Sequence, residues 1–182
     1  MTKSIRIYLI LFILTGFFAC NDITKKPIHF TDEFTFKDMR GKENKFYGFK
    51  NKDSAIFWAK KEDKHILVLF SGYACMAESG IEWRTLSYYG NNNKIQDKFI
   101  LLWLAVDETT LLNDTIGHID CFGPRRYLVT VGDKNTLWQA LLTKTNTQPT
   151  MCFIDTNENP KGHLLHYGKD EQKLRNFIES GL

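Results

Sequence analysis

The chain of 182 residues contains no C-x-x-C pair anywhere. Without such a pair, neither a cysteine-type structural zinc site nor a dithiol redox motif can be assigned. Cysteine is also scarce: apart from Cys20, only Cys75, Cys121 and Cys152 are present. Because three is an odd number, an oxidising compartment would leave at least one free thiol or one bond to another molecule.

The chain also has no large excess of positive or negative charge. The formal net charge of +3 includes Lys3 and Arg6, and removal of the segment that carries them would leave +1. A nearly neutral domain gives no electrostatic reason to expect nucleic acid as a partner. The sequence has no internal repeat and no low-complexity segment, and its hydrophobic content of 43% suits one globular domain with a full-sized core.

The N-terminus has the pattern of an export signal. A short basic region with Lys3 and Arg6 precedes an apolar run of roughly 15 residues, which is too short for a confident membrane-spanning helix. The run ends in Phe17-Phe18-Ala19-Cys20, which resembles the lipobox of bacterial lipoproteins. This resemblance implies a signal peptide over 1–19 and a lipid on Cys20, so that acyl chains would hold the domain at a membrane. The alternative is ordinary cleavage near Ala19, with Cys20 incidental.

Hydrophobic periodicity predicts an α/β domain over 53–182, preceded by a tether and N-terminal strands over 20–52. Strands are predicted over 28–36, 45–49, 66–70, 99–106, 150–154 and 163–167, and helices over 53–62, 76–89, from 133 and from 170. The strand over 99–106 is apolar on both faces, which predicts a central position in the sheet. Alternation of strands and helices predicts a parallel sheet covered on both faces, and the closing hairpin adds an antiparallel edge, so the whole is a mixed sheet flanked by helices.

Finer details of these helices can also be predicted. Asp53 and Asp133 are the expected helix caps. The helix from 133 should bury the stripe Leu137, Trp138, Leu141 and Leu142, and the last helix should bury Leu174, Phe177 and Ile178. The segment from 107 to 132 is far longer than the usual connection of about 4–6 residues and is treated as an insert.

A single cysteine stands at the start of a predicted helix. The buried strand ending at Phe70 is followed by Ser71-Gly72-Tyr73-Ala74 and then Cys75. A thiol at a helix N-terminus is activated, because the helix dipole favours negative charge there.

These residues and five later segments resemble one family. The chain is similar to the thioredoxin-like domain at the C-terminus of the disulfide reductase DsbD and to its free-standing bacterial relatives. The matching segments are Phe70 to Cys75, Glu82-Trp83, Val106-Asp107, Thr130 to Lys134, Gln148-Pro149, and the turn Asn159 to Gly162. The resemblance runs from about Asp53 to Leu182 and implies the thioredoxin fold with extra strands in front. It departs from the family at Glu78, which replaces the second cysteine, and at Ala74, which replaces glycine.

The resemblance implies a site around Cys75. Cys75 would be the attacking thiol, and Glu78 would occupy the place of the resolving cysteine. A carboxylate beside a thiol raises the thiol's pKa, so Cys75 should be less reactive than in a dithiol site. Tyr73, Ala74, Gln148 and Pro149 would bind an extended peptide, with the bond before Pro149 in cis.

Other cysteines and the histidines give weaker signals. Cys121, in the insert, is a speculative partner for Cys75; the alternative is an unpaired cysteine. Cys152 is expected to be a small buried core residue. His163 and His166 should point to opposite faces of one strand, so no metal site and no cofactor are predicted. Asp107 and Glu108 either lie near the active edge or form a solvated turn.

Three functions remain open at this stage. The first is an exported lipoprotein of the bacterial envelope, facing the periplasm, that binds envelope proteins or peptides or forms single-cysteine mixed disulfides. The second is an active thiol-disulfide oxidoreductase that uses Cys75 with help from Cys121 or an external thiol. The third is a structural lipoprotein domain in which Cys75 has no role. Full dithiol activity is not expected, because Glu78 cannot resolve a mixed disulfide.

Overall fold

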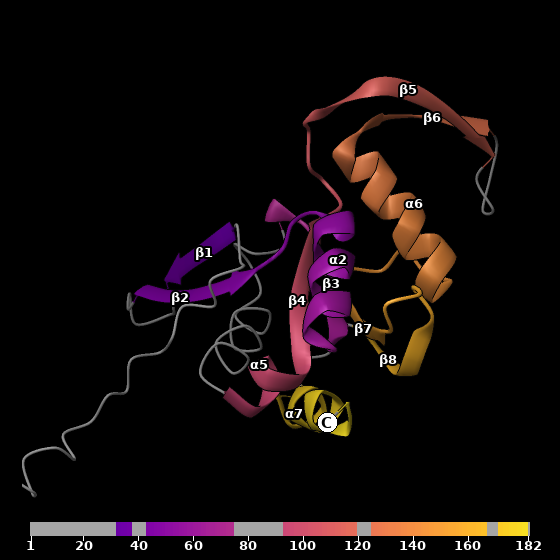
Figure 1. Cartoon of the computed structure of the whole chain (residues 1–182). Helices are drawn as coiled ribbons and strands as arrows, with labels where there is room; N and C mark the ends of the chain where they lie inside the picture. The colour runs from indigo at the N-terminus through magenta and orange to yellow at the C-terminus, as the bar shows by residue number, and fades with distance from the viewer. Residues whose placement is uncertain (1–31, 38–42, 75–92, 120–124, 167–170, 182) are drawn as a thin grey trace, which may run out of the picture.

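A computed structural model describes residues 32–37, 43–74, 93–119, 125–166 and 171–181 of the chain (Figure 1). Its architecture is mixed α/β. The elements in chain order are β1 (Asp32–Lys37), β2 (Glu43–Gly48), α2 (Lys52–Glu62), β3 (His65–Ser71), α5 (Asn93–Lys98), β4 (Phe99–Ala105), β5 (Leu111–Ile119), β6 (Arg125–Thr130), α6 (Val131–Thr143), β7 (Thr150–Ile154), β8 (Pro160–His166) and α7 (Glu171–Ser180). The predicted helix over 76–89 lies outside the described residues.

A four-stranded mixed sheet organises the fold. Its strand order is β4-β3-β7-β8. Only β3 and β4 run parallel, whereas β7 is antiparallel to both of its neighbours, β3 and β8. The closing hairpin therefore supplies the antiparallel edge that the sequence predicts, but the sheet holds a single parallel pair among its described strands.

The predicted central position of β4 is wrong. β3 and β7 are the inner strands, and β4 ends the order, although all seven of its residues are buried. Its outer edge is covered by Phe49, which donates its backbone N–H to Leu101 O at 2.8 Å and accepts from Trp103 N at 2.8 Å. Burial on both faces depends on what covers those faces, so an apolar strand can still end the strand order.

Side chains of the sheet alternate between two hydrophobic clusters. In β3, Leu67 and Leu69 join a cluster completed by α7, whereas Ile66, Val68 and Phe70 join a cluster completed by α2 and α6. The period of two follows from the pleat of a strand. Leu174, Phe177 and Ile178 of α7 are buried, as predicted.

Both predicted helix caps are one turn or less from the real ones. The cap of α2 is Asn51, whose side chain accepts a hydrogen bond from Ser54 N, so Asp53 lies inside the first turn. The cap of α6 is Thr130, which forms a capping box with Asp133 three residues later. The predicted stripe of α6 is also partly wrong, because Leu141 is 45% exposed while Gln139, Ala140 and Thr143 are buried.

Two hairpins stand outside the main sheet. β1 pairs with β2 in antiparallel register, which confirms the predicted N-terminal strands with shifted ends. β5 pairs with β6, and this hairpin occupies the segment that the sequence presented only as a long connection. Figure 1 shows it beside α6, which β6 contacts, and Leu128 of β6 is buried. No helix of the described residues is long and apolar enough to cross a membrane.

Candidate functional site

Three connecting segments meet at one edge of the main sheet. The ends of β3 and β4 are in register there, with Ser71 opposite Ala105, and β7 begins beside them, with Thr150 opposite Phe70. Val106 N donates to Ser71 O at 2.8 Å, which continues the pairing past the end of β4. The segments 72–74, 106–110 and 145–149 are thereby brought to the same edge.

Asp107 holds the segment that precedes Cys75. Its carboxylate accepts hydrogen bonds from Tyr73 N at 2.8 Å and from Ala74 N at 3.1 Å. Gly72 permits this approach, because a Cβ at that position would lie 2.8 Å from Asp107 Oδ2. The carboxylate serves as a helix cap supplied from another strand end, since Tyr73 and Ala74 have helical backbone geometry.

Tyr73 is fixed by two further contacts. Its ring meets Trp103 edge-on, with ring centres 5.2 Å apart and an interplanar angle of 83°. Its hydroxyl donates to Glu108 Oε2 at 2.8 Å. Partial burial, the hydrogen bond to Glu108 and the charges of Glu108 and Asp107 raise the pKa of Tyr73 to about 12. The hydroxyl is therefore a permanent donor near neutral pH.

Glu108 is held as an anion. Its Oε1 accepts from the hydroxyl of Thr110 at 2.8 Å and from Thr110 N at 3.1 Å. These bonds, together with the bond from Tyr73, lower the pKa of Glu108, because each donor favours the charged form. The carboxylate of Glu108 is consequently held in one orientation beside Tyr73.

The first turn of α6 locks the loop that carries Asp107 and Glu108. Gly132 N donates to Glu108 O at 3.0 Å, and Val131 N donates to Thr110 O at 2.8 Å. Asn135 adds a side-chain bond, from Nδ2 to Ala105 O at 2.8 Å. A Cβ on Gly132 would lie 2.7 Å from two backbone oxygens, those of Val106 and Glu108, so only glycine fits.

The third segment contains the predicted cis bond. The Gln148–Pro149 peptide bond is cis, which confirms that prediction. Buried Gln139 supports the segment from α6: its Nε2 donates to Thr147 O at 2.7 Å, and its Oε1 accepts from Gln148 Nε2 at 3.0 Å. Thr150 Oγ1 also donates to Thr147 O, at 2.6 Å.

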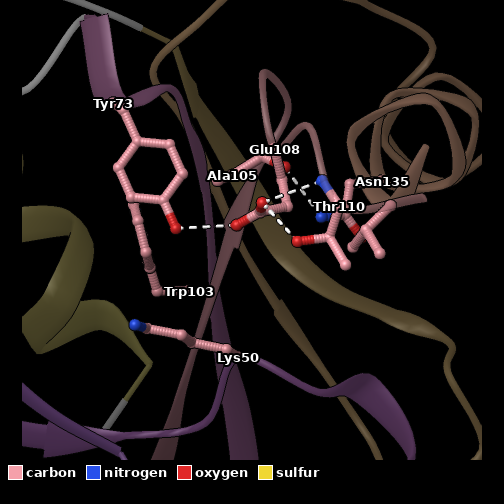
Figure 2. Close-up of a pocket in the computed structure, with 8 residues that line it drawn as sticks. Lys50, Tyr73, Trp103, Ala105, Glu108, Thr110 and Asn135 are labelled. Atoms are coloured by element: carbon pink, nitrogen blue, oxygen red, sulfur yellow. Dashed lines mark hydrogen bonds between the residues drawn. The ribbon is translucent and has the colours of Figure 1, made fainter.

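A small pocket opens beside Tyr73, with a volume of about 140 Å³ (Figure 2). Its walls are Tyr73 and Trp103, and its lining continues through Lys50, Ala105, Glu108, Thr110, Val131 and Asn135. Figure 2 shows Lys50 and Glu108 on opposite sides of the space. Lys50 Nζ lies 5.7 Å from the centre of the Trp103 ring. The pocket therefore combines aromatic walls with one fixed anion and one cation.

The predicted site residues are only partly described. Tyr73 and Ala74 are exposed, and Pro149 is buried. Cys20, Cys75, Glu78 and Cys121 lie outside the described residues, so their predicted roles stay predictions.

Residues on either side of Cys121 are described. Ile119 and Arg125 pair at the end of the β5–β6 hairpin opposite to the pair Leu111 and Thr130. Eight strand steps of roughly 3.3 Å separate the two ends of β5. The flanks of Cys121 thus lie at the end of the hairpin that is remote from the 106–110 loop.

Cys152 is a free and fully buried cysteine of β7, as predicted. Burial raises the pKa of its thiol to about 12, so it stays protonated and inert. Among the described residues, no group of three or more His, Cys, Asp and Glu side chains is placed to hold a metal ion.

Sequence reasoning missed two parts of the site. Gln139 was hidden in an otherwise apolar stripe, and only its polarity at a buried helical position could have marked it. The contact of Lys50 with Trp103 joins positions far apart in sequence, and no local pattern announces it. Comparison with protein-family models and with curated proteins finds no match to this chain.

Proposed function

We propose that this chain is a thioredoxin-like domain of an exported, lipid-anchored envelope protein. In this proposal it binds extended segments of partner proteins beside Cys75 and forms single-cysteine mixed disulfides with them. The order of elements, the closing antiparallel hairpin and the cis bond before Pro149 support the thioredoxin-like part. The lipid anchor rests on the sequence around Cys20.

One observation carries the functional part of the proposal. The segment that leads directly into Cys75 begins next to Phe70, and the segment that contains Pro149 ends at Thr150; these two residues are paired on neighbouring antiparallel strands. Each segment is fixed by a polar side chain from elsewhere, Asp107 for the first and Gln139 for the second. A preorganised edge of this kind suits an extended peptide, because little ordering cost remains at binding.

The chemistry is thiol-disulfide exchange that stops after one step. The Cys75 thiolate attacks one sulfur of a partner's disulfide, a new sulfur–sulfur bond forms, and the other partner sulfur leaves as a thiolate. No external oxidant or reductant is consumed. Because Glu78 stands where a resolving thiol would be needed, the mixed disulfide persists until a thiol from another molecule attacks it.

The decisive experiment traps these adducts. The full chain is produced in a bacterium, the cells are quenched in acid, free thiols are alkylated, and proteins are separated without reductant. We expect reducible adducts with the wild type and with Cys121→Ala, and none with Cys75→Ala. Cys121→Ala is the matched control, since it also removes one thiol but leaves Cys75 in place.

Purified protein separates binding from turnover. We expect no sustained reduction of insulin disulfides, but one equivalent of adduct at Cys75. Sustained reduction that vanishes in Cys75→Ser would replace the proposal by an active oxidoreductase using Cys121 or an external thiol. Absence of adducts both in cells and with purified protein would falsify the redox part.

The anchor is tested separately. Metabolic labelling with a radioactive fatty acid should mark the wild type, and Cys20→Ser should abolish the label. A labelled Cys20→Ser variant would show that the lipid lies elsewhere, and an unlabelled wild type would favour ordinary cleavage near Ala19.

A further inference from the structure

The pocket beside Tyr73 has the size of one side-chain end. Its volume of about 140 Å³ is close to that of an engineered cavity, roughly 150 Å³, that accepts benzene. Aromatic faces line it, and Ala105 and Val131 add aliphatic surface. Such a pocket accommodates the end of one long side chain, and its polar groups determine which kind.

The polar groups of the pocket favour a positively charged guest. Glu108 Oε2 accepts one hydrogen bond, from Tyr73, and keeps a lone pair for a second donor. The Asn135 amide donates through Nδ2 to Ala105 O, and its oxygen accepts no hydrogen bond in the part of the chain that the structure describes. A lysine or arginine end supplies several donors, and the faces of Tyr73 and Trp103 attract cations as well.

The local balance of charge points in the same direction. Three carboxylates, those of Glu108, Asp107 and Asp32, act on the Tyr73 hydroxyl, and their negative field contributes to its raised pKa. Lys50 is the only cationic side chain among the residues described as lining the pocket. It lies 5.7 Å from the centre of the Trp103 ring, on the side opposite Glu108 (Figure 2). A second cation can therefore approach Glu108 without displacing Lys50.

The pocket is also adjacent to the peptide-binding edge. Tyr73 lies two residues before Cys75 in the sequence. Its ring lines the pocket, and its backbone N–H donates to the carboxylate of Asp107. An extended peptide advances about 3.3–3.6 Å per residue, so a side chain within a few residues of the partner's cysteine can reach it.

The geometry points to a specificity pocket that accepts one lysine or arginine side chain of the bound partner. This inference rests on the proposed function and names the substrate class of the same site: extended segments with a basic residue close to a cysteine. Tyr73, Glu108 and Asn135 are its recognition residues, and Lys50 limits it to a single guest.

Peptides without cysteine test the pocket directly. The full chain, solubilised in detergent, is titrated with fluorescent Gly-Ser peptides that carry one lysine, and with matched peptides that carry glutamine or glutamate instead. Fluorescence anisotropy gives the dissociation constants. We expect the lysine peptide to bind roughly five- to ten-fold more tightly than the glutamine peptide, and the preference to shrink in about 0.5 M salt.

Charge-matched variants identify the side chains that cause the preference for the lysine peptide. Glu108→Gln should abolish it, since the amide still accepts from Tyr73 but carries no charge. Glu62→Gln on α2, which changes the net charge equally and lies outside the pocket lining, should leave it unchanged. Lys50→Gln should enlarge the preference for lysine, because it removes a positive charge that repels the lysine of the peptide. Thermal unfolding of each variant verifies that the fold is retained.

The same peptides with a cysteine disulfide separate this inference from the proposed function. Equal binding of lysine and glutamine peptides, or tighter binding of the glutamate peptide, overturns the pocket even where Cys75 adducts form. Preference for lysine that survives in the absence of any adduct supports the pocket and removes the covalent part of the proposed function. Preference for lysine that persists in Glu108→Gln also overturns the assignment.

Discussion

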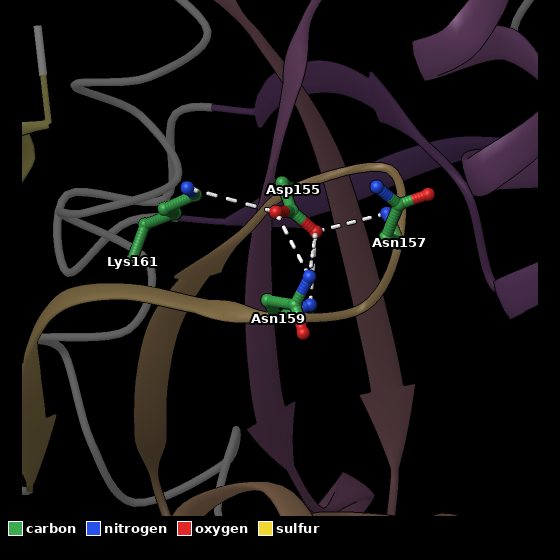
Figure 3. A network of polar contacts seen from close by, with 4 residues as sticks. All are labelled: Asp155, Asn157, Asn159 and Lys161. Atoms are coloured by element: carbon green, nitrogen blue, oxygen red, sulfur yellow. Dashed lines mark hydrogen bonds and ion pairs between the residues drawn. The ribbon is translucent and has the colours of Figure 1, made fainter.

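Two polar networks of this protein are built in opposite ways. At the β7–β8 turn, Asp155 accepts from the backbone N–H groups of Asn157 and Asn159, both at 2.9 Å, and lies 3.6 Å from Lys161 (Figure 3). At the candidate site, Asp107 accepts from Tyr73, a residue 34 positions away. The first network is closed within seven residues, whereas the second joins the ends of two strands.

This difference shows which contacts fix the geometry of the candidate site. A short loop is closed at little entropic cost, so the Asp155 turn can form from its own sequence. Asp107 lies beside Tyr73 because β3 and β4 are paired in register and because the first turn of α6 is hydrogen-bonded to the 106–110 loop. The geometry of the site is therefore coupled to the packing of the whole sheet, and that of the turn is not.

The largest effect is expected where α6 touches the site loop. Gly132→Ala places a Cβ 2.7 Å from the backbone oxygens of Val106 and Glu108, which cannot rotate away. We expect a loss of about 1–3 kcal/mol in the free energy of unfolding, measured by urea denaturation. Gly162→Ala is the control: its φ of 69° is unfavourable for alanine, but no heavy atom lies within 4 Å. Its cost should be smaller, about 1 kcal/mol.

The next largest effect is expected from the loss of Gln139, which supports the Pro149 segment. Gln139→Ala leaves the backbone oxygen of Thr147 without its 2.7 Å donor and removes the acceptor of the Gln148 amide. Loss of buried hydrogen bonds predicts a destabilisation of about 1–3 kcal/mol. Gln172→Ala, at an exposed position of α7, should stay within about 0.5 kcal/mol of the wild type. Equal stability of the two variants would show that the segment orders itself without α6.

Removal of Asp107 should have a local effect. In Asp107→Ala the amides of Tyr73 and Ala74 lose their acceptor, so their hydrogen exchange should accelerate by roughly tenfold or more, with a global loss of about 1 kcal/mol. Gly72→Ala should act in the same direction, because it pushes the carboxylate away. Asp155→Ala is the control that breaks the other network. Faster exchange of Tyr73 in that control would contradict the independence of the two regions.

The smallest effect is the pH dependence of the Asp155 turn. Hydrogen bonds from Asn159 and Asn157 lower the pKa of Asp155 from 3.8 to about 2. Because the folded pKa is depressed, the contribution to stability is fully present above the ordinary pKa and is lost as the pH falls through about 2. The difference in unfolding free energy between wild type and Asp155→Asn should therefore shrink between pH 4 and pH 2 in denaturant titrations. A constant difference over this interval would contradict the prediction.

Much of the fold follows from local patterns. β3 and β7 match their predicted spans within one residue at each end, since a continuous run of four or five apolar residues is typical of a buried strand. The predicted caps are wrong because Asp53 and Asp133 are good cap residues that lie in the first turn of their helices, where acidic side chains are also favourable. The β5–β6 hairpin was missed because its strands mix polar and apolar residues without clear alternation.

The sequence by itself determined the strands of the main sheet, helices α2, α6 and α7, the turn between β7 and β8, and the order in which a lone cysteine follows a buried strand. Each of these features depends on side chains within a few positions of one another, and hydrophobic periodicity and turn residues predict such local structure. Only the tertiary structure decided that Asp107 caps the segment before Cys75, that Gln139 supports Pro149, and that Lys50, Tyr73 and Glu108 surround one pocket. Those contacts arise when distant segments are brought together by burial of the sheet, and no local pattern encodes the distances between them.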